Sequence, residues 1–192
     1  IDRLNDDGKT RRQFGNMILS RLPVIQAFNF QLPQPIPETP CKHMPRQAIE
    51  VVVAAHDEPI RITTTHLEYH TQAQRLAQAA ALRNIQSDVV ANADYAAYAP
   101  TSGPYAAVPR PVYSILCGDF NSAPYDAVYD VLIAADSAQD GYRDAWEIAN
   151  LSQPHAPTCG IFDHKQWPQG PHCRDFFFIS DTLAERKVQV SA

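Results

Sequence analysis

The sequence has few cysteines, and none of them forms a pattern typical of a disulfide framework. The chain has four cysteines at positions 41, 117, 159 and 173, and no two of them form a C-x-x-C pair. Small secreted domains that depend on disulfides have a much higher density of cysteine. We therefore expect no disulfide framework, although a single bridge remains an alternative, and the cysteine usage favours a cytoplasmic protein.

The chain also lacks long apolar runs and blocks of positive charge. No stretch approaches the roughly 18 consecutive apolar residues of a transmembrane helix, so we expect no membrane span. Lysine and arginine number 16 against 21 acidic residues, which gives a net charge of −5, and no basic block exceeds the pair Arg11-Arg12. This balance does not indicate nucleic acid as a partner. Nothing in the sequence indicates an oligomeric state.

The remaining composition is that of one globular domain. The chain has 192 residues, of which 45% are hydrophobic and 19% charged, so it is long enough to bury a core. Residues 1–13 are polar and predict an exposed loop. A strand is predicted over residues 16–22, ending at Pro23, because proline cannot donate to a β ladder. The prolines between positions 33 and 45 indicate an irregular connector.

Two strands and two helices are predicted next. Residues 49–54 and 60–65 flank a His-Asp-Glu-Pro turn, which indicates a β-hairpin. Thr71 and Gln74 fit a capping box at the start of a helix, whose packed face would carry Ala73, Leu76, Ala79 and Ala80. Pro124 predicts the first turn of a second helix, which would bury Tyr125, Val128, Val131, Leu132 and Ala135. Two further strands are expected over residues 175–180 and 186–190.

The stretch Val112-Tyr113-Ser114-Ile115-Leu116-Cys117-Gly118-Asp119-Phe120-Asn121 indicates a buried strand with a polar end. Residues two apart point the same way in an extended chain, so Asp119 and Asn121 would share one face. A carboxylate beside an amide suits phosphate chemistry, because the first can bind a metal or activate water and the second can hold an oxygen. Without other motifs, a capping aspartate at a strand-to-helix turn would explain the pattern equally well.

Three other motifs accompany this strand. They are Gly15-Asn16-Met17-Ile18-Leu19-Ser20-Arg21, Thr64-Thr65-His66-Leu67-Glu68 and Arg174-Asp175-Phe176-Phe177-Phe178-Ile179-Ser180. In order and spacing, the set resembles the endonuclease/exonuclease/phosphatase superfamily of metal-dependent phosphohydrolases over roughly residues 14 to 190. The resemblance implies an α/β fold: a two-sheet β-sandwich flanked by helices in four layers (α/β/β/α), formed here by a single domain over residues 1–192.

The resemblance also implies a role for each motif residue. His66 would contact the scissile phosphate, either by donating a hydrogen bond or by protonating the leaving oxygen. Asp119 would orient or deprotonate the attacking water, and Asn121 would position Asp119 and bind the phosphate. Asp175 would orient a further histidine. Mg²⁺ is the implied cofactor, with Mn²⁺ as an alternative, and Asp119 and Asn121 are its candidate ligands.

The implied activity is hydrolysis of a phosphoester by in-line attack of activated water. The substrate would be a phosphodiester, a phosphomonoester or nucleic acid, of which the acidic balance favours nucleic acid least. The family's Gln-Glu motif, which carries its main magnesium ligand, and its Ser-Asp-His motif do not occur in these residues, so the fold would be incomplete at the termini. We therefore expect little activity from residues 1–192 alone. The alternative is a phosphate-binding module without catalytic activity.

Two further expectations concern the surroundings of this site. The residues His155, Cys159, His164, His172 and Cys173 could ligate zinc, but their spacing matches no common zinc motif. We expect them to border the pocket instead, with Tyr142, His164 and Trp167 contacting the leaving group. The Ala/Tyr/Pro-rich residues 95–110 are expected near the mouth of the cleft, where they would select substrates, although a loop packed on the surface is the more common interpretation of such an insertion.

Overall fold

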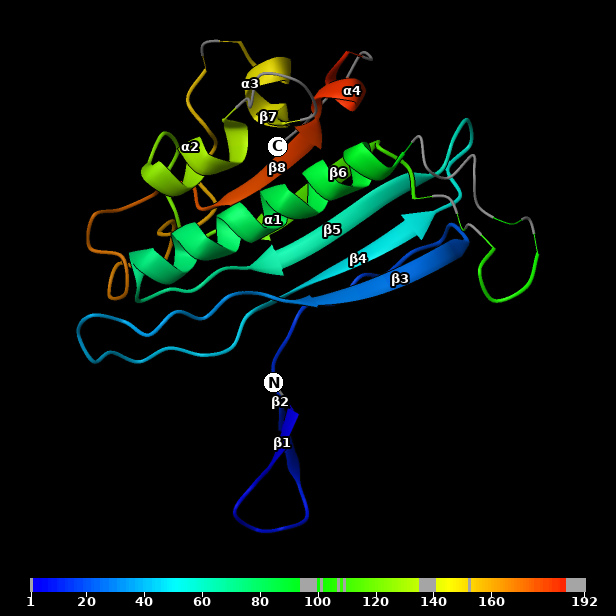
Figure 1. Ribbon diagram of the computed structural model, residues 1–192. Helices are drawn as coiled ribbons and strands as arrows, with labels where there is room; N and C mark the ends of the chain where they lie inside the picture. Colours follow the sequence, from blue (N-terminus) through cyan, green and yellow to red (C-terminus); the bar gives the residue numbers. More distant parts are fainter. Residues whose placement is uncertain are drawn as a thin grey trace.

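The computed structural model describes residues 2–93, 100, 102–106, 108, 110–134, 141–151 and 153–185. Eight strands form a two-stranded and a six-stranded sheet, the latter in the order β3-β4-β5-β6-β8-β7 (Figure 1). The strands are β1 (Asp2–Leu4), β2 (Arg11–Gln13), β3 (Val24–Gln31), β4 (Gln47–Val53), β5 (Ile60–His66), β6 (Ser114–Asp119), β7 (Tyr142–Asp144) and β8 (Asp175–Ser180). The helices are α1 (Gln72–Asn92), α2 (Ala127–Ile133), α3 (Ala145–Ala149) and α4 (Asp181–Ala184).

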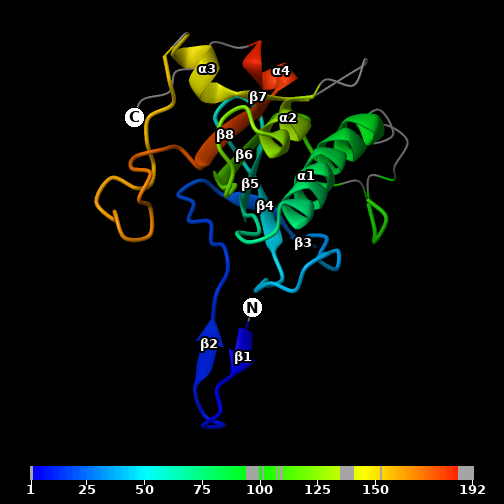
Figure 2. The same ribbon diagram turned by 90° about the vertical axis from the view of Figure 1, so that its left-hand side faces the viewer.

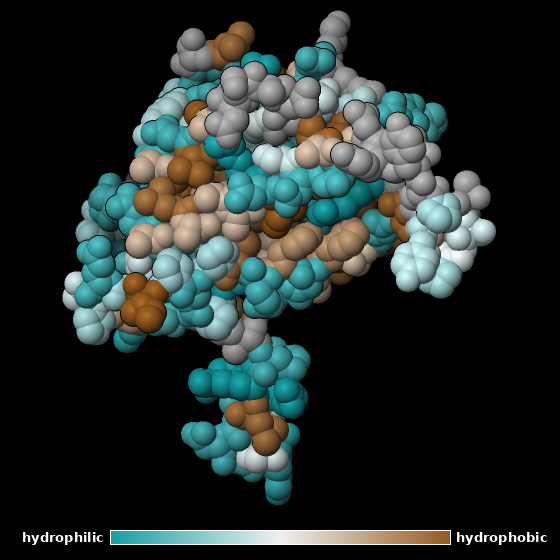
Figure 3. Space-filling model, viewed as in Figure 1, coloured by the Kyte–Doolittle hydropathy of each residue, from teal (hydrophilic) through white to brown (hydrophobic). Residues whose placement is uncertain are grey.

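The α/β class with two sheets and flanking helices is confirmed. The long helix α1 lies across the six-stranded sheet, and α2 lies beside it (Figures 1 and 2). Between these helices and the sheet is an apolar core that includes Leu82, Leu116, Leu132 and Phe178. The smaller sheet, β1 with β2, projects from this body, and its surface is mainly hydrophilic (Figure 3). No helix in the described part of the chain is long and apolar enough to cross a bilayer.

The strand pairing brings three of the predicted motifs to one edge of the sheet. The hairpin of β4 with β5 is antiparallel, as predicted. Strands β5 and β6 are parallel, with Arg61 opposite Ser114 and His66 opposite Asp119. Parallel neighbours need a long crossover, and α1 supplies it. Strand β8 pairs antiparallel with β6, so Asp119 lies opposite Asp175.

Helix α1 begins where the sequence predicts, but its packed face differs. Thr71 is the N-cap, and its side chain accepts a hydrogen bond from the Gln74 backbone N–H. The predicted capping box is wrong in its second half, because Gln74 donates to the Pro35 carbonyl. Of the predicted face, Ala79 is buried and Leu76 packs against the core, whereas Ala73 is exposed. The residues of α1 that are buried are Gln74, Gln78, Ala79, Leu82, Gln86 and Val89.

The glutamines of this face satisfy backbone groups that simple periodicity cannot foresee. Gln78 accepts from the Glu68 backbone N–H at 2.9 Å and donates to the Pro33 carbonyl. Gln86 accepts from the buried Arg61 and donates to the Val112 carbonyl. Buried polar groups need such partners, so the glutamines replace the small apolar residues that were expected.

Three predicted segments near the N-terminus and around α2 differ from the structure. Residues 2–13 are largely exposed, as predicted for this segment, but they contain the hairpin of β1 and β2. Residues 16–22 form no strand in the described structure, and the strand follows Pro23 instead of preceding it. Helix α2 has Asp126 as its N-cap, so Pro124 precedes the helix and Tyr125 is exposed. Residue 135 and the predicted strand over 186–190 lie outside the described residues.

The stretch expected at the cleft mouth joins the opposite end of the sheet. Residues 94–99, 101, 107 and 109 lie outside the described structure, but Arg110 and Pro111 lead into the start of β6 at Ser114, five residues before Asp119. There Arg110 donates to the buried Glu50 at 2.8 Å, and Arg61 donates to the Pro111 carbonyl at 2.6 Å. At Arg110 the expectation that this stretch borders the site is wrong, because the ion pair with Glu50 holds this residue near the far ends of β5 and β6. For residues 95–99, 101, 107 and 109 the expectation lies outside the described structure.

Candidate active site

Side chains from three adjacent strands meet at one edge of the sheet. His66 is the last residue of β5, Asp119 is the last of β6, and Asp175 is the first of β8. The register places His66 beside Asp119 and Asp119 beside Asp175. The His66 Nε2 atom lies 3.5 Å from Asp119 Oδ2. The sequence prediction that these residues share one edge of the central strands agrees with this register.

Gly118 lets β5 and β6 approach each other just before their ends. Its φ is +142°, and a Cβ built on it would lie 2.0 Å from the Thr65 carbonyl oxygen. No side chain fits at that distance, so only glycine allows this geometry. The Gly118-Asp119 sequence therefore fixes the position of the carboxylate relative to His66.

The turn after β6 holds Asp119 and Asn121 in place. Asn121 has a φ of +50°, in the left-handed region that asparagine tolerates better than most residues. Its backbone N–H donates to Asp119 Oδ1 at 2.8 Å, and its side-chain amide donates to the Leu67 carbonyl at 2.9 Å. Asn121 thus ties the end of β6 to the chain that follows β5, and its N–H orients Asp119.

Asp175 carries the second carboxylate of the site. Burial raises the pKa of Asp175, and the neighbouring charge of Asp119 acts in the same direction, whereas Thr158 and His66 oppose the shift. Two carboxylates on adjacent strands favour sharing a proton or binding a cation.

The imidazole of His66 is shifted toward its neutral form. Burial lowers the pKa of His66, and the positive charge of Arg46 lowers it further, against the opposing effects of Asp119 and Asp175. The ring of Phe14 lies 5.7 Å from the His66 ring, centroid to centroid. A neutral imidazole keeps one N–H with which to donate a hydrogen bond.

Glu68 is a residue of the site region to which the sequence analysis assigned no role. Its side chain is 1% exposed, and it accepts from Arg46 Nε at 3.3 Å and from the backbone N–H groups of Met44 and His70. Burial acts to raise the pKa of Glu68, but these donors outweigh it and the pKa is lowered. The signal was present in the sequence, because Glu68 belongs to the Thr-Thr-His-Leu-Glu motif, although its partners come from a distant segment.

The cysteine and histidine residues downstream do not form a zinc site. Within the described residues, no group of three or more His, Cys, Asp or Glu side chains is arranged to hold a metal ion. His172 Nε2 instead lies 3.1 Å from Cys159 Sγ and 3.0 Å from Arg174 Nε. His155 is buried against Asp144 at 2.6 Å.

Of the three residues expected to contact the leaving group, one lies far from the site. Tyr142 is buried and pairs with Ser180 at the opposite end of β8 from Asp175, so that prediction is wrong. Trp167 lies under the guanidinium of Arg174, 4.5 Å from ring centroid to Cζ, and thus next to the strand that begins at Asp175. His164 is exposed, and its contact with a leaving group stays a prediction.

The donor set at the strand ends fits a hard cation in part. Asp119, Asn121 and Asp175 offer oxygen atoms, which Mg²⁺ and Mn²⁺ prefer. The amide nitrogen of Asn121 donates to Leu67, which leaves its side-chain oxygen free of that bond. Mg²⁺ is often bound through only one or two carboxylates, with water and substrate oxygens completing its coordination.

Comparisons with known proteins concern the family and the fold. Residues 5–192 match the model of the Endonuclease/Exonuclease/phosphatase family, whereas a search of the curated proteins found no match. Similar solved structures include a mannosyl-6-phosphatase of Bacteroides thetaiotaomicron (TM-score 0.53, 14% identity, 84% of this chain and 54% of the other). An endonuclease/exonuclease/phosphatase of Bacteroides vulgatus has a TM-score of 0.56 at 14% identity, and the match covers 83% of this chain and 54% of the other.

The human Nocturnin catalytic domain, solved with a bound sulfate, is a third similar structure (TM-score 0.51, 20% identity, 84% of this chain and 49% of the other). At these identities the likeness concerns the fold alone. The chain spans about half the length of the structures it matches.

Proposed function

Because the chain belongs to the Endonuclease/Exonuclease/phosphatase family, we propose that it acts in the hydrolysis of a phosphoester at the ends of β5, β6 and β8. The observation that carries the proposal is the register of these strands, which aligns His66, Asp119 and Asp175 in a row. The row joins a hydrogen-bond donor to two carboxylates, groups that can stabilise a phosphoryl oxygen and accept a proton from water.

The proposed chemistry assigns one task to each side chain. Asp119, oriented by the Asn121 N–H, accepts a proton from the attacking water as the new P–O bond forms. His66 donates a hydrogen bond to a phosphate oxygen, a role that suits its lowered pKa better than proton donation at neutral pH. The bond between phosphorus and the leaving oxygen breaks on the side opposite the water, and the leaving oxygen takes a proton from solvent water.

The proposed metal ion is Mg²⁺ or Mn²⁺, held by Asp119 and Asn121 with Asp175 nearby. Such an ion supplies positive charge that offsets the charge developing on the phosphoryl oxygens. Burial is the main cause of the raised pKa of Asp175, and the neighbouring charge of Asp119 adds to it. A cation would offset the repulsion between the two carboxylates.

The proposed class of phosphoester follows from the names of similar solved structures. One neighbour is named a mannosyl-6-phosphatase, so a phosphomonoester of a small molecule stands beside a phosphodiester as a substrate. A second candidate function is phosphate binding without turnover. It is favoured by one observation: within the described residues, no group of three or more His, Cys, Asp or Glu side chains is arranged to hold a metal ion.

The test compares the full-length gene product with its Asp119→Asn variant. Hydrolysis of p-nitrophenyl phosphate and of bis(p-nitrophenyl) phosphate is followed across a MgCl₂ titration, with EDTA as the metal-free arm. We expect Asp119→Asn to lower the rate by about a hundredfold or more, because it removes the group that accepts the proton. Which of the two esters is hydrolysed decides the substrate class.

The matched control is Asp57→Asn, which makes the same change at an exposed aspartate whose side chain is 84% accessible. It is expected to keep the wild-type rate. Equal rates in wild type and Asp119→Asn would refute the catalytic role of Asp119. Phosphate binding with no turnover in wild type would favour the binding module.

A further inference from the structure

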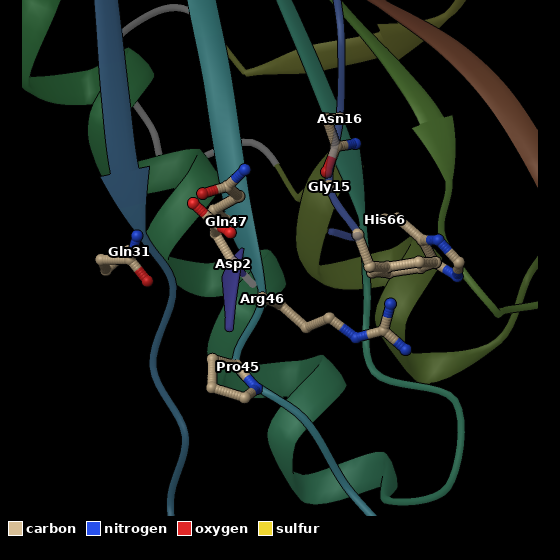
Figure 4. A pocket seen from close by; sticks show the side chains of 9 residues that line it. Asp2, Gly15, Asn16, Gln31, Pro45, Arg46, Gln47 and His66 are labelled. Carbon is tan, nitrogen blue, oxygen red and sulfur yellow. The ribbon is translucent and has the colours of Figure 1, made fainter. Parts of the chain in front are cut away.

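A cavity of about 480 Å³ lies beside the proposed reaction centre, and His66 belongs to both (Figure 4). It is lined by Asp2, Phe14, Gly15, Asn16, Gln31, Pro45, Arg46, Gln47 and His66. Asp119, Asn121 and Asp175 are not among its lining residues. A group bound in this cavity is therefore a different part of a ligand from the phosphoryl group at Asp119.

Arg46 is the charged residue on which the cavity depends. Its side chain is 5% exposed and extends across the cavity toward His66 (Figure 4). Its Nε donates to Glu68 at 3.3 Å, but its Nη1 is buried and has no hydrogen-bond partner. A buried guanidinium N–H without an acceptor is costly, and an anionic oxygen in the cavity would satisfy it.

The other polar lining groups are mostly amides. The cavity walls carry the side chains of Asn16, Gln31 and Gln47, which can donate to further oxygen atoms. A Cβ on Gly15 would lie 3.2 Å from the Gln47 side-chain nitrogen, so the glycine leaves room for that amide. The one carboxylate of the lining, on Asp2, is already held by Arg11 at 2.7 Å.

We propose that this cavity binds a second anionic group, a phosphate or a carboxylate, carried by the same ligand whose phosphoryl group lies at His66 and Asp119. This proposal rests on the proposed function. It adds the substrate class: a phosphoester that carries a further anionic group a few bonds from the phosphorus. Arginine suits this role, because its fork of N–H donors can bind Glu68 on one side and two oxygen atoms on the other.

The test uses three phosphonates that cannot be hydrolysed and that differ only in the second group. Propylphosphonate has none, propane-1,3-diphosphonate has a second phosphonate, and 4-phosphonobutyrate has a carboxylate. Dissociation constants are measured by calorimetry on the full-length gene product in the presence of MgCl₂. We expect at least one of the two probes that carry a second anionic group to bind about tenfold more tightly than propylphosphonate, as one charge-assisted hydrogen bond predicts.

The variant is Arg46→Lys, which keeps the positive charge beside Glu68 and removes the fork of donors. It should reduce the tenfold preference to about threefold or less. Arg110→Lys is the matched control, because it makes the same change in an arginine that pairs with a buried glutamate at the far end of the sheet. The control should keep the full preference, and circular dichroism verifies that both variants are folded.

The outcomes separate this proposal from the proposed function. Binding of propylphosphonate with no gain from a second anion would overturn the anion cavity and leave the phosphate site intact. An equal loss for all three probes in Arg46→Lys would also overturn it, because Arg46 would then contact the reacting phosphoryl group. Failure of every probe to bind wild type would refute the phosphate site itself and the cavity proposal with it.

Discussion

At the scale of the residue, buried charges around His66 decide how the site works. Glu68 balances Arg46, and Arg46 in turn lowers the pKa of His66. Asp119 and Asp175 act in the opposite direction on the same imidazole. The protonation of His66 therefore depends on Arg46, which lies just before β4, as well as on Asp119 and Asp175 at the ends of β6 and β8.

A first prediction concerns the contribution of Glu68 to stability. Its pKa in the folded chain lies below the ordinary value of 4.5. The ionised form is thus favoured by folding, and its contribution is complete above about pH 4.5 and is lost as the pH falls through the lowered pKa. Urea unfolding between pH 7 and pH 3 should show a steeper loss for wild type than for Glu68→Gln.

At neutral pH, Glu68→Gln should lower the free energy of unfolding by about 3 kcal/mol, because it leaves Arg46 buried without a counter-charge. Glu38→Gln, at an exposed position, is the control and should change the free energy by less than about 0.5 kcal/mol. If the stability of wild type fell with pH in parallel with that of Glu68→Gln, Glu68 would not be the ionised group that stabilises the fold.

At the scale of the element, the strands and helix starts could be predicted where local chemistry decides them. The hairpin of β4 and β5, the end of β6 and the N-cap of α1 follow from alternation, turn composition and a capping threonine. The buried glutamines of α1 could not be predicted, since their partners are backbone groups of Pro33, Pro35 and Val112, far away in sequence. For the same reason the roles of Arg46 and Glu68 were missed.

A second prediction concerns Gly118, where β5 and β6 approach most closely. Gly118→Ala should destabilise the fold by about 3 kcal/mol or more, because a Cβ there would overlap the Thr65 carbonyl. Gly8→Ala has a positive φ as well but open space around the new atom, so it should cost about 1 kcal/mol at most. Thermal unfolding of both variants measures the difference, and equal costs would show that the close approach is unimportant.

At the scale of the whole molecule, the six-stranded sheet presents the site residues along one edge. The family motifs predicted this arrangement of His66, Asp119 and Asp175 correctly, because strand ends are fixed by the motifs themselves. They did not predict where Arg110 lies, since that depends on its ion pair with Glu50 at the other end of the sheet. The likeness to solved structures extends over about half of their length.

A third prediction concerns the activity of residues 1–192 by themselves. The strand ends supply two carboxylates and one amide, which leave most positions of an octahedral magnesium ion to water. We expect the isolated chain to hydrolyse bis(p-nitrophenyl) phosphate at a rate close to that of its Asp119→Asn variant, across a MgCl₂ titration. A rate well above that variant would mean that these residues contain the complete catalytic set.

The most direct test of the central claim, that the ends of β5, β6 and β8 bind a phosphate group, is a histidine-detected NMR titration of the 192-residue chain. Inorganic phosphate is added in the presence of MgCl₂, and the imidazole signals of all seven histidines are followed. A saturable shift of the His66 signal is expected, and Asp119→Asn should weaken it, with no shift of His56, whose side chain is fully exposed. A His66 signal that stays unchanged while phosphate binds elsewhere, for example at His172, would contradict the claim.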